Sequence, residues 1–102
     1  MRIAVIGDYE SPDYQDLLLR LQIVFPGETV LDLSRHDREF WKKSKDERLK
    51  DIELAQIIII CADWDRLTDA KIDITSAQSL RKECFIDISG RFLPFPEYAK
   101  RW

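Results

Sequence analysis

The chain has 102 residues, 16 of them basic and 19 acidic, and its formal net charge is −3. Charges of both signs are mixed along it, so the composition predicts no nucleic-acid partner and no membrane surface. There is no apolar run of the roughly 20 residues that a membrane span needs and no secretory leader after Met1, so we expect a cytoplasmic protein. The length predicts a single domain over residues 1–102 with one core.

The first third of the chain predicts a strand, a helix and a second strand. Residues 2–6 are a short apolar run that ends at Gly7. Ser11-Pro12-Asp13 then predicts a helix start, because serine caps free amides, proline fits the first turn and an acid there favours the helix dipole. Apolar residues recur at three- and four-residue spacing up to Phe25, and a second strand is expected over residues 29–33.

The middle of the chain predicts a charged helix followed by a buried strand. Residues 35–53 carry many charges of both signs, which indicates a helix with a solvated polar face. His36 has no cysteine or acid at metal-ligand spacing, so we interpret it as a solvent-facing side chain. Four consecutive isoleucines and Cys61 then form a stiff run that is apolar on both faces, which is typical of a strand inside a parallel sheet.

The last third predicts a helix over residues 71–81, a fourth strand over residues 85–88 and an irregular tail. Prolines within residues 91–96 exclude an interior strand there, and residues 97–102 predict a short helix or turn. Large apolar side chains crowd this tail, and so small a domain has little core left for them, so we expect a homodimer or larger homo-oligomer. These side chains are Phe92, Leu93, Phe95, Tyr98 and Trp102.

This alternation predicts an α/β fold, a small three-layer, Rossmann-like parallel sheet of about four strands in the order 2-1-3-4, flanked by helices. The strand order reverses between the first and third strands, and ligands of open α/β sheets bind at such a switch point, beyond the carboxyl ends of the strands. The residues expected there are Gly7, Asp8 and Tyr9 on one side, and Asp63 and Trp64 on the other. We therefore predict that these residues contact a ligand, together with Asp65 and Asp69 farther along the same segment.

The two cysteines, Cys61 and Cys84, lie in or beside apolar strand-like runs. Because disulfides are rare in the cytosol, we expect buried, reduced thiols. No cluster with metal-ligand spacing is present, so the sequence predicts neither a metal nor a cofactor.

The segment from Trp64 to Leu80 resembles the third strand-to-helix segment of the nucleoside 2-deoxyribosyltransferase-like proteins. Small members of this family carry a tryptophan after a hydrophobic strand, then an acidic–basic pair, a Ser-Lys-Gly-like turn, an Ala-Arg-Leu-Glu run and an alanine four residues later. The matching positions here are Trp64, Asp65, Arg66, Ala70, Lys71, Ile72, Asp73 and Ala77. The resemblance implies a Rossmann-like homo-oligomer that binds a nucleoside or nucleotide, with Asp73 in the place of the catalytic glutamate.

In the family, that glutamate attacks the anomeric carbon of a nucleoside and forms a glycosyl-enzyme intermediate. A carboxylate suits this step because it meets the developing oxocarbenium charge. Asp73 keeps the carboxylate but is one methylene shorter, and a misplacement of about 1 Å can cost on the order of a hundredfold in rate. Asp69 replaces the turn glycine, where it would repel a phosphate, and residues 7–11 replace the family's Ala-Gly-Pro-like loop.

Each predicted site residue also has a structural interpretation. Asp73 suits a first-turn helix acid, Asp63 and Asp65 suit turn caps, and Trp64 suits a cover for the sheet edge as well as a base-stacking surface. The sequence therefore leaves two functions open. One is an enzyme that cleaves or transfers the N-glycosidic bond through Asp73, and the other is a non-catalytic nucleoside- or nucleotide-binding module on the same fold. A receiver-like signalling domain is disfavoured, because the adjacent acids expected after the first strand do not stand out.

Overall fold

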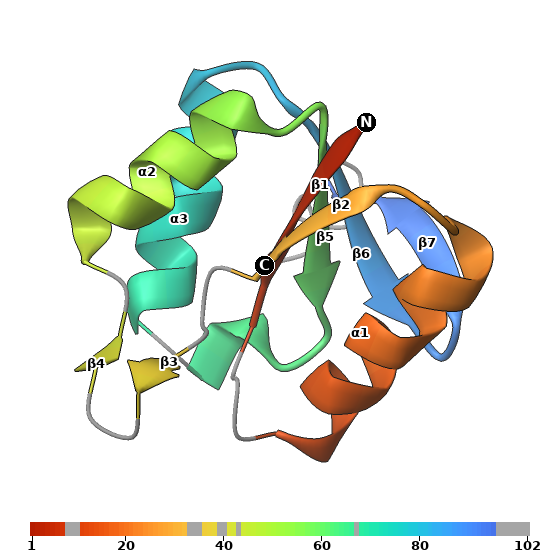
Figure 1. Ribbon diagram of the computed structural model, residues 1–102. Helices are drawn as coiled ribbons and strands as arrows, with labels where there is room; N and C mark the ends of the chain where they lie inside the picture. Colours follow the sequence, from red (N-terminus) through yellow and green to blue (C-terminus); the bar gives the residue numbers. More distant parts are fainter. Residues whose placement is uncertain (8–10, 33–35, 39–40, 43, 67, 96–102) are drawn as a thin grey trace.

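A mostly parallel five-stranded sheet forms the middle layer of the protein, with helices on both faces (Figure 1). The computed structural model describes residues 1–7, 11–32, 36–38, 41–42, 44–66 and 68–95. The helices are α1 (Pro12–Val24), α2 (Lys45–Leu54) and α3 (Thr68–Ser79), with a short 3-10 helix, η1 (Trp64–Arg66). The strands are β1 (Arg2–Ile6), β2 (Thr29–Asp32), β3 (His36–Arg38), β4 (Trp41–Lys42), β5 (Ile57–Cys61), β6 (Glu83–Ile88) and β7 (Arg91–Pro94).

The strand order is β2-β1-β5-β6-β7, in which the first four strands are parallel and β7 pairs antiparallel with β6. The predicted α/β class is confirmed. The predicted sheet of four strands in the order 2-1-3-4 is incomplete, because β7 adds a fifth strand at the edge. The chain reaches β7 through Ser89 and Gly90, whose φ angles of 52° and 84° suit a two-residue hairpin turn. Pro94 ends this strand, and an edge position tolerates the proline that an interior strand would not.

Two apolar layers form because alternate residues of a strand point to opposite faces of the sheet. One face carries α1, and its core contains Ile3, Val5, Tyr14, Leu17, Leu21, Ile59 and Cys61. The other face carries α2 and α3, and its core includes Ala4, Ile52, Ile58, Ile60, Ile74, Ala77 and Ile86. Figure 1 shows α1 on one side of the sheet and the α2–α3 pair on the other. Because the alternation in β1 and β5 makes both faces of the sheet apolar, helices cover both faces and the fold has three layers.

Serine side chains cap the N-termini of two helices, α1 and α2. The Ser11 Oγ accepts a hydrogen bond from the Asp13 amide at 3.2 Å, so α1 starts where the sequence predicts. The Ser44 Oγ accepts from the Glu47 amide at 3.2 Å and caps α2. The prediction of a helix over residues 35–53 is therefore wrong in its first half: the antiparallel pair β3–β4 comes first, and α2 begins at Lys45.

Two further predictions need correction. Helix α3 begins at Thr68 rather than at Lys71, so Asp73 lies in its second turn and not in the first. Phe95 is fully buried against Trp64, so this part of the tail does find a core, whereas Tyr98 and Trp102 lie outside the described residues. None of the helices in the described part of the chain has both the length and the apolar character that crossing a bilayer requires.

Candidate functional site

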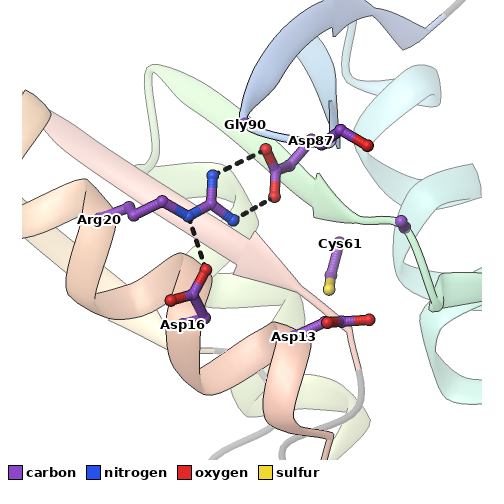
Figure 2. Close-up of a pocket in the computed structure, with 8 residues that line it drawn as sticks. Asp13, Asp16, Arg20, Cys61, Asp87 and Gly90 are labelled. Atoms are coloured by element: carbon purple, nitrogen blue, oxygen red, sulfur yellow. Dashed lines mark hydrogen bonds and ion pairs between the residues drawn. The ribbon is translucent and has the colours of Figure 1, made fainter.

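A pocket of about 430 Å³ lies at the carboxyl ends of β5 and β6, on the sheet face that α1 covers (Figure 2). Helix α1, the end of β5, β6 and the β6–β7 turn all contribute to it. The lining residues are Asp13, Asp16, Arg20, Cys61, Ala62, Asp87, Ser89 and Gly90. Ligand sites are commonly of this size, and open α/β sheets bind ligands at this end of their strands.

One wall of the pocket is a polar stripe along α1. Asp13, Asp16 and Arg20 are three and four residues apart, so they share one face of the helix, while Tyr14, Leu17 and Leu21 turn into the core. The Arg20 Nε donates to Asp16 Oδ2 at 2.9 Å, an i,i+4 pair that holds the arginine along the helix. The spacing of α1 thus serves the core and the pocket at once.

Arg20 also joins α1 to the sheet. Its Nη1 donates to Asp87 Oδ1 at 3.0 Å and its Nη2 donates to Oδ2 at 2.6 Å, which makes a bidentate pair (Figure 2). Asp87 is buried, and its hydrogen bonds are the main reason that the pKa of Arg20 is raised above its usual value. Because carboxylates occupy both edges of the guanidinium, Arg20 presents little free positive charge to a ligand.

The Cys61 thiol lies in the pocket on the side of Asp13 (Figure 2). Burial raises the pKa of this thiol to about 12; the Asp63 amide opposes the shift, and the carboxylates of Asp63 and Asp13 add to it. A thiol with such a pKa stays neutral at physiological pH and is a poor nucleophile. Cys61 and Cys84 are both buried free thiols, as predicted.

The charge of the pocket decides which chemistry it suits. The lining contains three carboxylates, those of Asp13, Asp16 and Asp87, and one guanidinium, that of Arg20, so its formal net charge is −2. Carboxylates accept hydrogen bonds from hydroxyl, amide and amine donors and repel phosphate. Among the described residues, no group of three or more histidine, cysteine or acidic side chains is arranged to hold a metal ion.

Gly7, which was predicted to contact a ligand, packs closely against Cys61 and Tyr14. A Cβ at this position would lie 2.6 Å from both the Cys61 Cβ and the Tyr14 Cδ2, so only glycine fits. The Tyr14 hydroxyl donates to the Val5 carbonyl oxygen at 3.2 Å and fixes the ring there. The structure therefore gives Gly7 a packing role, and its contact with a ligand stays a prediction. Asp8 and Tyr9 lie outside the described residues.

The other residues predicted beyond β5 fall into different environments. Asp63, in the turn after β5, is only 6% exposed, and neither of its carboxylate oxygens has a hydrogen-bond partner among the described residues. Trp64 is 6% exposed and packs edge-to-face on Phe95 with ring centroids 5.5 Å apart, so it does not form an open stacking surface. Asp65, in η1, is exposed.

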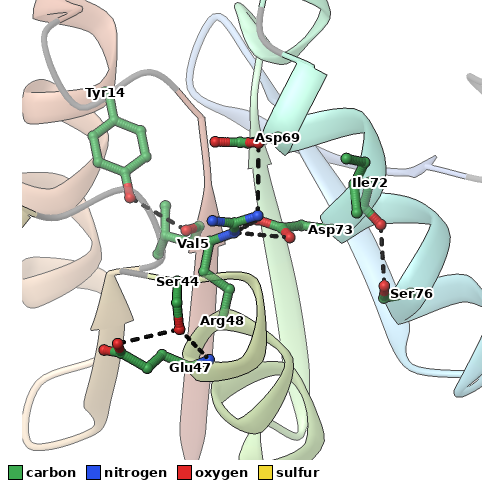
Figure 3. Close-up of polar contacts among 9 residues, drawn as sticks. All are labelled: Val5, Tyr14, Ser44, Glu47, Arg48, Asp69, Ile72, Asp73 and Ser76. Carbon is green, nitrogen blue, oxygen red and sulfur yellow. Dashed lines mark hydrogen bonds and ion pairs between the residues drawn. The ribbon is translucent and has the colours of Figure 1, made fainter. Parts of the chain in front are cut away.

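Asp73, the predicted nucleophile, is held by an arginine of α2. The Arg48 Nε donates to both carboxylate oxygens of Asp73, at 3.0 and 2.9 Å (Figure 3). Asp69 lies one turn earlier in α3, and its Oδ1 is 3.7 Å from the Arg48 Nη2. Burial raises the pKa of the Asp73 carboxyl; Arg48 opposes this shift, and Asp69 adds to it. Arg48 was expected on a solvated face, but it is buried because α2 lays it against α3.

The pocket and Asp73 lie on different faces of the sheet. The pocket is on the face of α1, whereas Asp73 and Arg48 are between α2 and α3 on the other face (Figures 1 and 3). The structure thus places Asp73 and Asp69 on either side of Arg48, and neither of them is among the residues that line the pocket.

Sequence reasoning predicted none of the residues that line the pocket, and it missed all four of the charged ones: Asp13, Asp16, Arg20 and Asp87. The signal in α1 was available, since these polar residues share a helix face that the apolar spacing leaves free. Asp87 also carried a signal, because it interrupts the apolar run Phe85-Ile86-Asp87-Ile88 at a position that a sheet would bury.

Comparisons with protein-family models, curated proteins and solved structures found no match for this chain.

Proposed function

We propose that the protein binds a nucleoside in the pocket at the carboxyl ends of β5 and β6 and does not cleave its glycosidic bond. The observation that carries this proposal is the pocket itself, with its volume of about 430 Å³ and its net charge of −2. The carboxylates of Asp13 and Asp16 suit the hydroxyl groups of a sugar, because a carboxylate oxygen accepts hydrogen bonds from neighbouring hydroxyls.

The charge favours a nucleoside over a nucleotide. A phosphate would meet the net negative lining, and the guanidinium of Arg20 is already engaged by Asp87 and Asp16. The first turn of α1 carries Asp13 and that of α3 carries Asp69, so neither helix start offers its positive dipole to an anion unopposed. The nucleoside class rests on the resemblance of residues 64–80 to the nucleoside 2-deoxyribosyltransferase-like proteins.

The non-catalytic role is supported by the position of Asp73. A nucleophile must reach the anomeric carbon, but this carboxylate is 4% exposed, accepts two hydrogen bonds from Arg48 and is absent from the pocket lining. The competing proposal, a glycosidase or transferase with Asp73 as nucleophile, would need a ligand on the α2–α3 face.

We also propose that the protein is cytoplasmic and forms a homo-oligomer. Its two buried free thiols suit a reducing compartment.

Isothermal titration with nucleosides and nucleoside 5′-monophosphates, together with chromatography for released base, tests the proposal. We expect nucleosides to bind, monophosphates to bind more weakly, and no base to be released. Asp13→Asn should weaken binding by about tenfold or more, because it removes a charged acceptor. Asp46→Asn is the matched control, since Asp46 is also a first-turn helix acid but belongs to α2. Equal effects of the two substitutions, or an unaltered affinity in Ala62→Phe, which fills the pocket, would refute this site.

A further inference from the structure

Two of the non-glycine residues that the structure describes, Arg81 and Ser89, have a left-handed backbone. Their φ angles are 58° and 52°. A left-handed backbone crowds the Cβ of an ordinary side chain, and among non-glycine residues asparagine, aspartate and histidine adopt it most readily. Arginine and serine are therefore costly choices at these positions, and such positions concentrate where a protein binds a ligand.

The left-handed backbone of Arg81 has a structural reason. Arg81 follows α3, where its amide donates to the Gln78 carbonyl oxygen and the Lys82 amide donates to the Ala77 carbonyl oxygen, both at 3.0 Å. Helices commonly end in this way, with one left-handed residue that lets the chain satisfy the last carbonyl groups. Arg81 is exposed and is not among the residues that line the pocket, so its backbone serves the helix end.

Ser89 lies at the other end of β6 and lines the pocket. A Cβ built on its neighbour Gly90 would lie 3.9 Å from the Arg20 Nη1, so the turn borders the guanidinium that Figure 2 shows paired with Asp87. Ser89 is exposed, and its hydroxyl forms no hydrogen bond with another residue of the described chain. Asparagine or glycine at this position would form the two-residue turn more readily, so the turn itself does not call for serine.

The hydroxyl of Ser89 complements the other polar groups of the pocket. The three lining carboxylates only accept hydrogen bonds, and Arg20 directs its Nε to Asp16 and both of its terminal nitrogens to Asp87. The Cys61 thiol is a weak donor. A nucleoside carries acceptor atoms as well as hydroxyl donors, and a carboxylate cannot bind an acceptor. The serine hydroxyl can donate to such an atom.

We infer that Ser89 binds the nucleoside in this pocket and that its hydroxyl donates a hydrogen bond to an acceptor atom of the ligand. The inference rests on the proposed nucleoside binding and adds to it the donor that complements the lining carboxylates. Serine keeps the left-handed position because the ligand uses its hydroxyl, at a cost to the stability of the turn. Loss of this side chain should therefore raise stability and lower affinity.

Isothermal titration and thermal unfolding of three variants test this inference, with adenosine, guanosine, cytidine, uridine and their 2′-deoxy counterparts as ligands. Ser89→Gly removes the hydroxyl and the crowded Cβ, so it should raise the Tm and weaken binding by about three- to tenfold. Ser89→Ala removes the hydroxyl but keeps the Cβ, so it should weaken binding equally without raising the Tm. Arg81→Gly is the matched control, because it changes a left-handed residue outside the pocket lining. It should raise the Tm and keep the wild-type affinity.

The outcomes separate this inference from the proposed function. If none of these nucleosides binds the wild-type protein, both are overturned. If one binds and Ser89→Gly keeps the wild-type affinity, the inference is overturned and the proposed function stands. A Tm that falls in Ser89→Gly overturns the inference as well, because the serine would then stabilise the turn. An equal loss of affinity in Arg81→Gly also overturns it, since the loss would then not come from the hydroxyl.

Discussion

The ion pair of Arg48 with Asp73 gives the sharpest prediction about stability. The two side chains are 8% and 6% exposed, so water screens their interaction very little. Arg48→Met keeps most of the side-chain volume but leaves Asp73 as a buried carboxylate without its main partner. Removing one member of such a buried pair costs about 3–5 kcal/mol in the free energy of unfolding. Asp69 adds little, because its side chain is 55% exposed and 3.7 Å from the guanidinium.

The pH dependence of this loss follows from Asp73. Its pKa in the folded protein is raised by burial, so the folded state binds this proton more readily than the unfolded chain does. The stability that this proton contributes is fully present below the pKa of Asp73 in the unfolded chain. It is lost as the pH rises through the pKa of Asp73 in the folded protein. Arg48→Met removes the group that opposes the shift, so the pKa rises further. The destabilisation relative to wild type should therefore be largest near pH 8 and smaller near pH 5.

Urea unfolding followed by tryptophan fluorescence at both pH values measures this effect. Lys50→Met is the matched control, because Lys50 is an exposed cation on the same helix. Replacing both partners, Arg48→Met with Asp73→Leu, should recover most of the lost stability, because no charge is then left buried. If Arg48→Met and Lys50→Met unfold at the same urea concentration at pH 8, the pair contributes no net stability and the reasoning is refuted.

The remaining predictions concern packing, catalysis and assembly. Trp64→Ala should destabilise the protein by about 3–5 kcal/mol, and an unchanged Tm would place the indole outside the core. Gly7→Ala should cost about 1–3 kcal/mol because of its 2.6 Å contacts, and wild-type stability in urea would contradict this. Chromatography should detect no base released by the native protein or by Asp69→Gly with Asp73→Glu; robust release that Asp73→Asn abolishes would establish the enzyme instead. Light scattering should give at least twice the 12.1 kDa of one chain, and a monomer would exclude the homo-oligomer.

The sheet was predictable because its signals are local. The isoleucines of β5 and the alternation of apolar runs with helical spacing determine the parallel sheet and its covering helices. Strand β7 was missed because the prolines of residues 91–96 were interpreted as excluding an interior strand and no edge strand was predicted, although an edge strand that ends at Pro94 tolerates its proline. The burial of Phe95 follows from β7, since the strand returns the chain to the core.

The sequence predicted only the end of the sheet at which the pocket lies. A ligand was expected between β1 and β5, whereas the pocket lies at the ends of β5 and β6, and none of the described residues predicted to contact a ligand lines it. Its charge pairs join residues far apart in the chain. Arg20 and Asp87 are 67 positions apart, and Arg48 and Asp73 are 25 apart. In the sequence, Arg48 is one charge among many in residues 35–53, and only the packing of α2 on α3 shows that it is buried.

The Arg48–Asp73 pair also bears on whether Asp73 is a nucleophile. The resemblance directs attention to Asp73, but the fold satisfies that carboxylate with Arg48 and keeps it between two helices. Because Asp73 is held by Arg48 and does not line the pocket, Asp73→Asn should lower the Tm and leave the nucleoside affinity unchanged. Thermal unfolding and titration of Asp73→Asn measure the two effects, and a loss of affinity at an unchanged Tm would assign Asp73 to ligand binding instead.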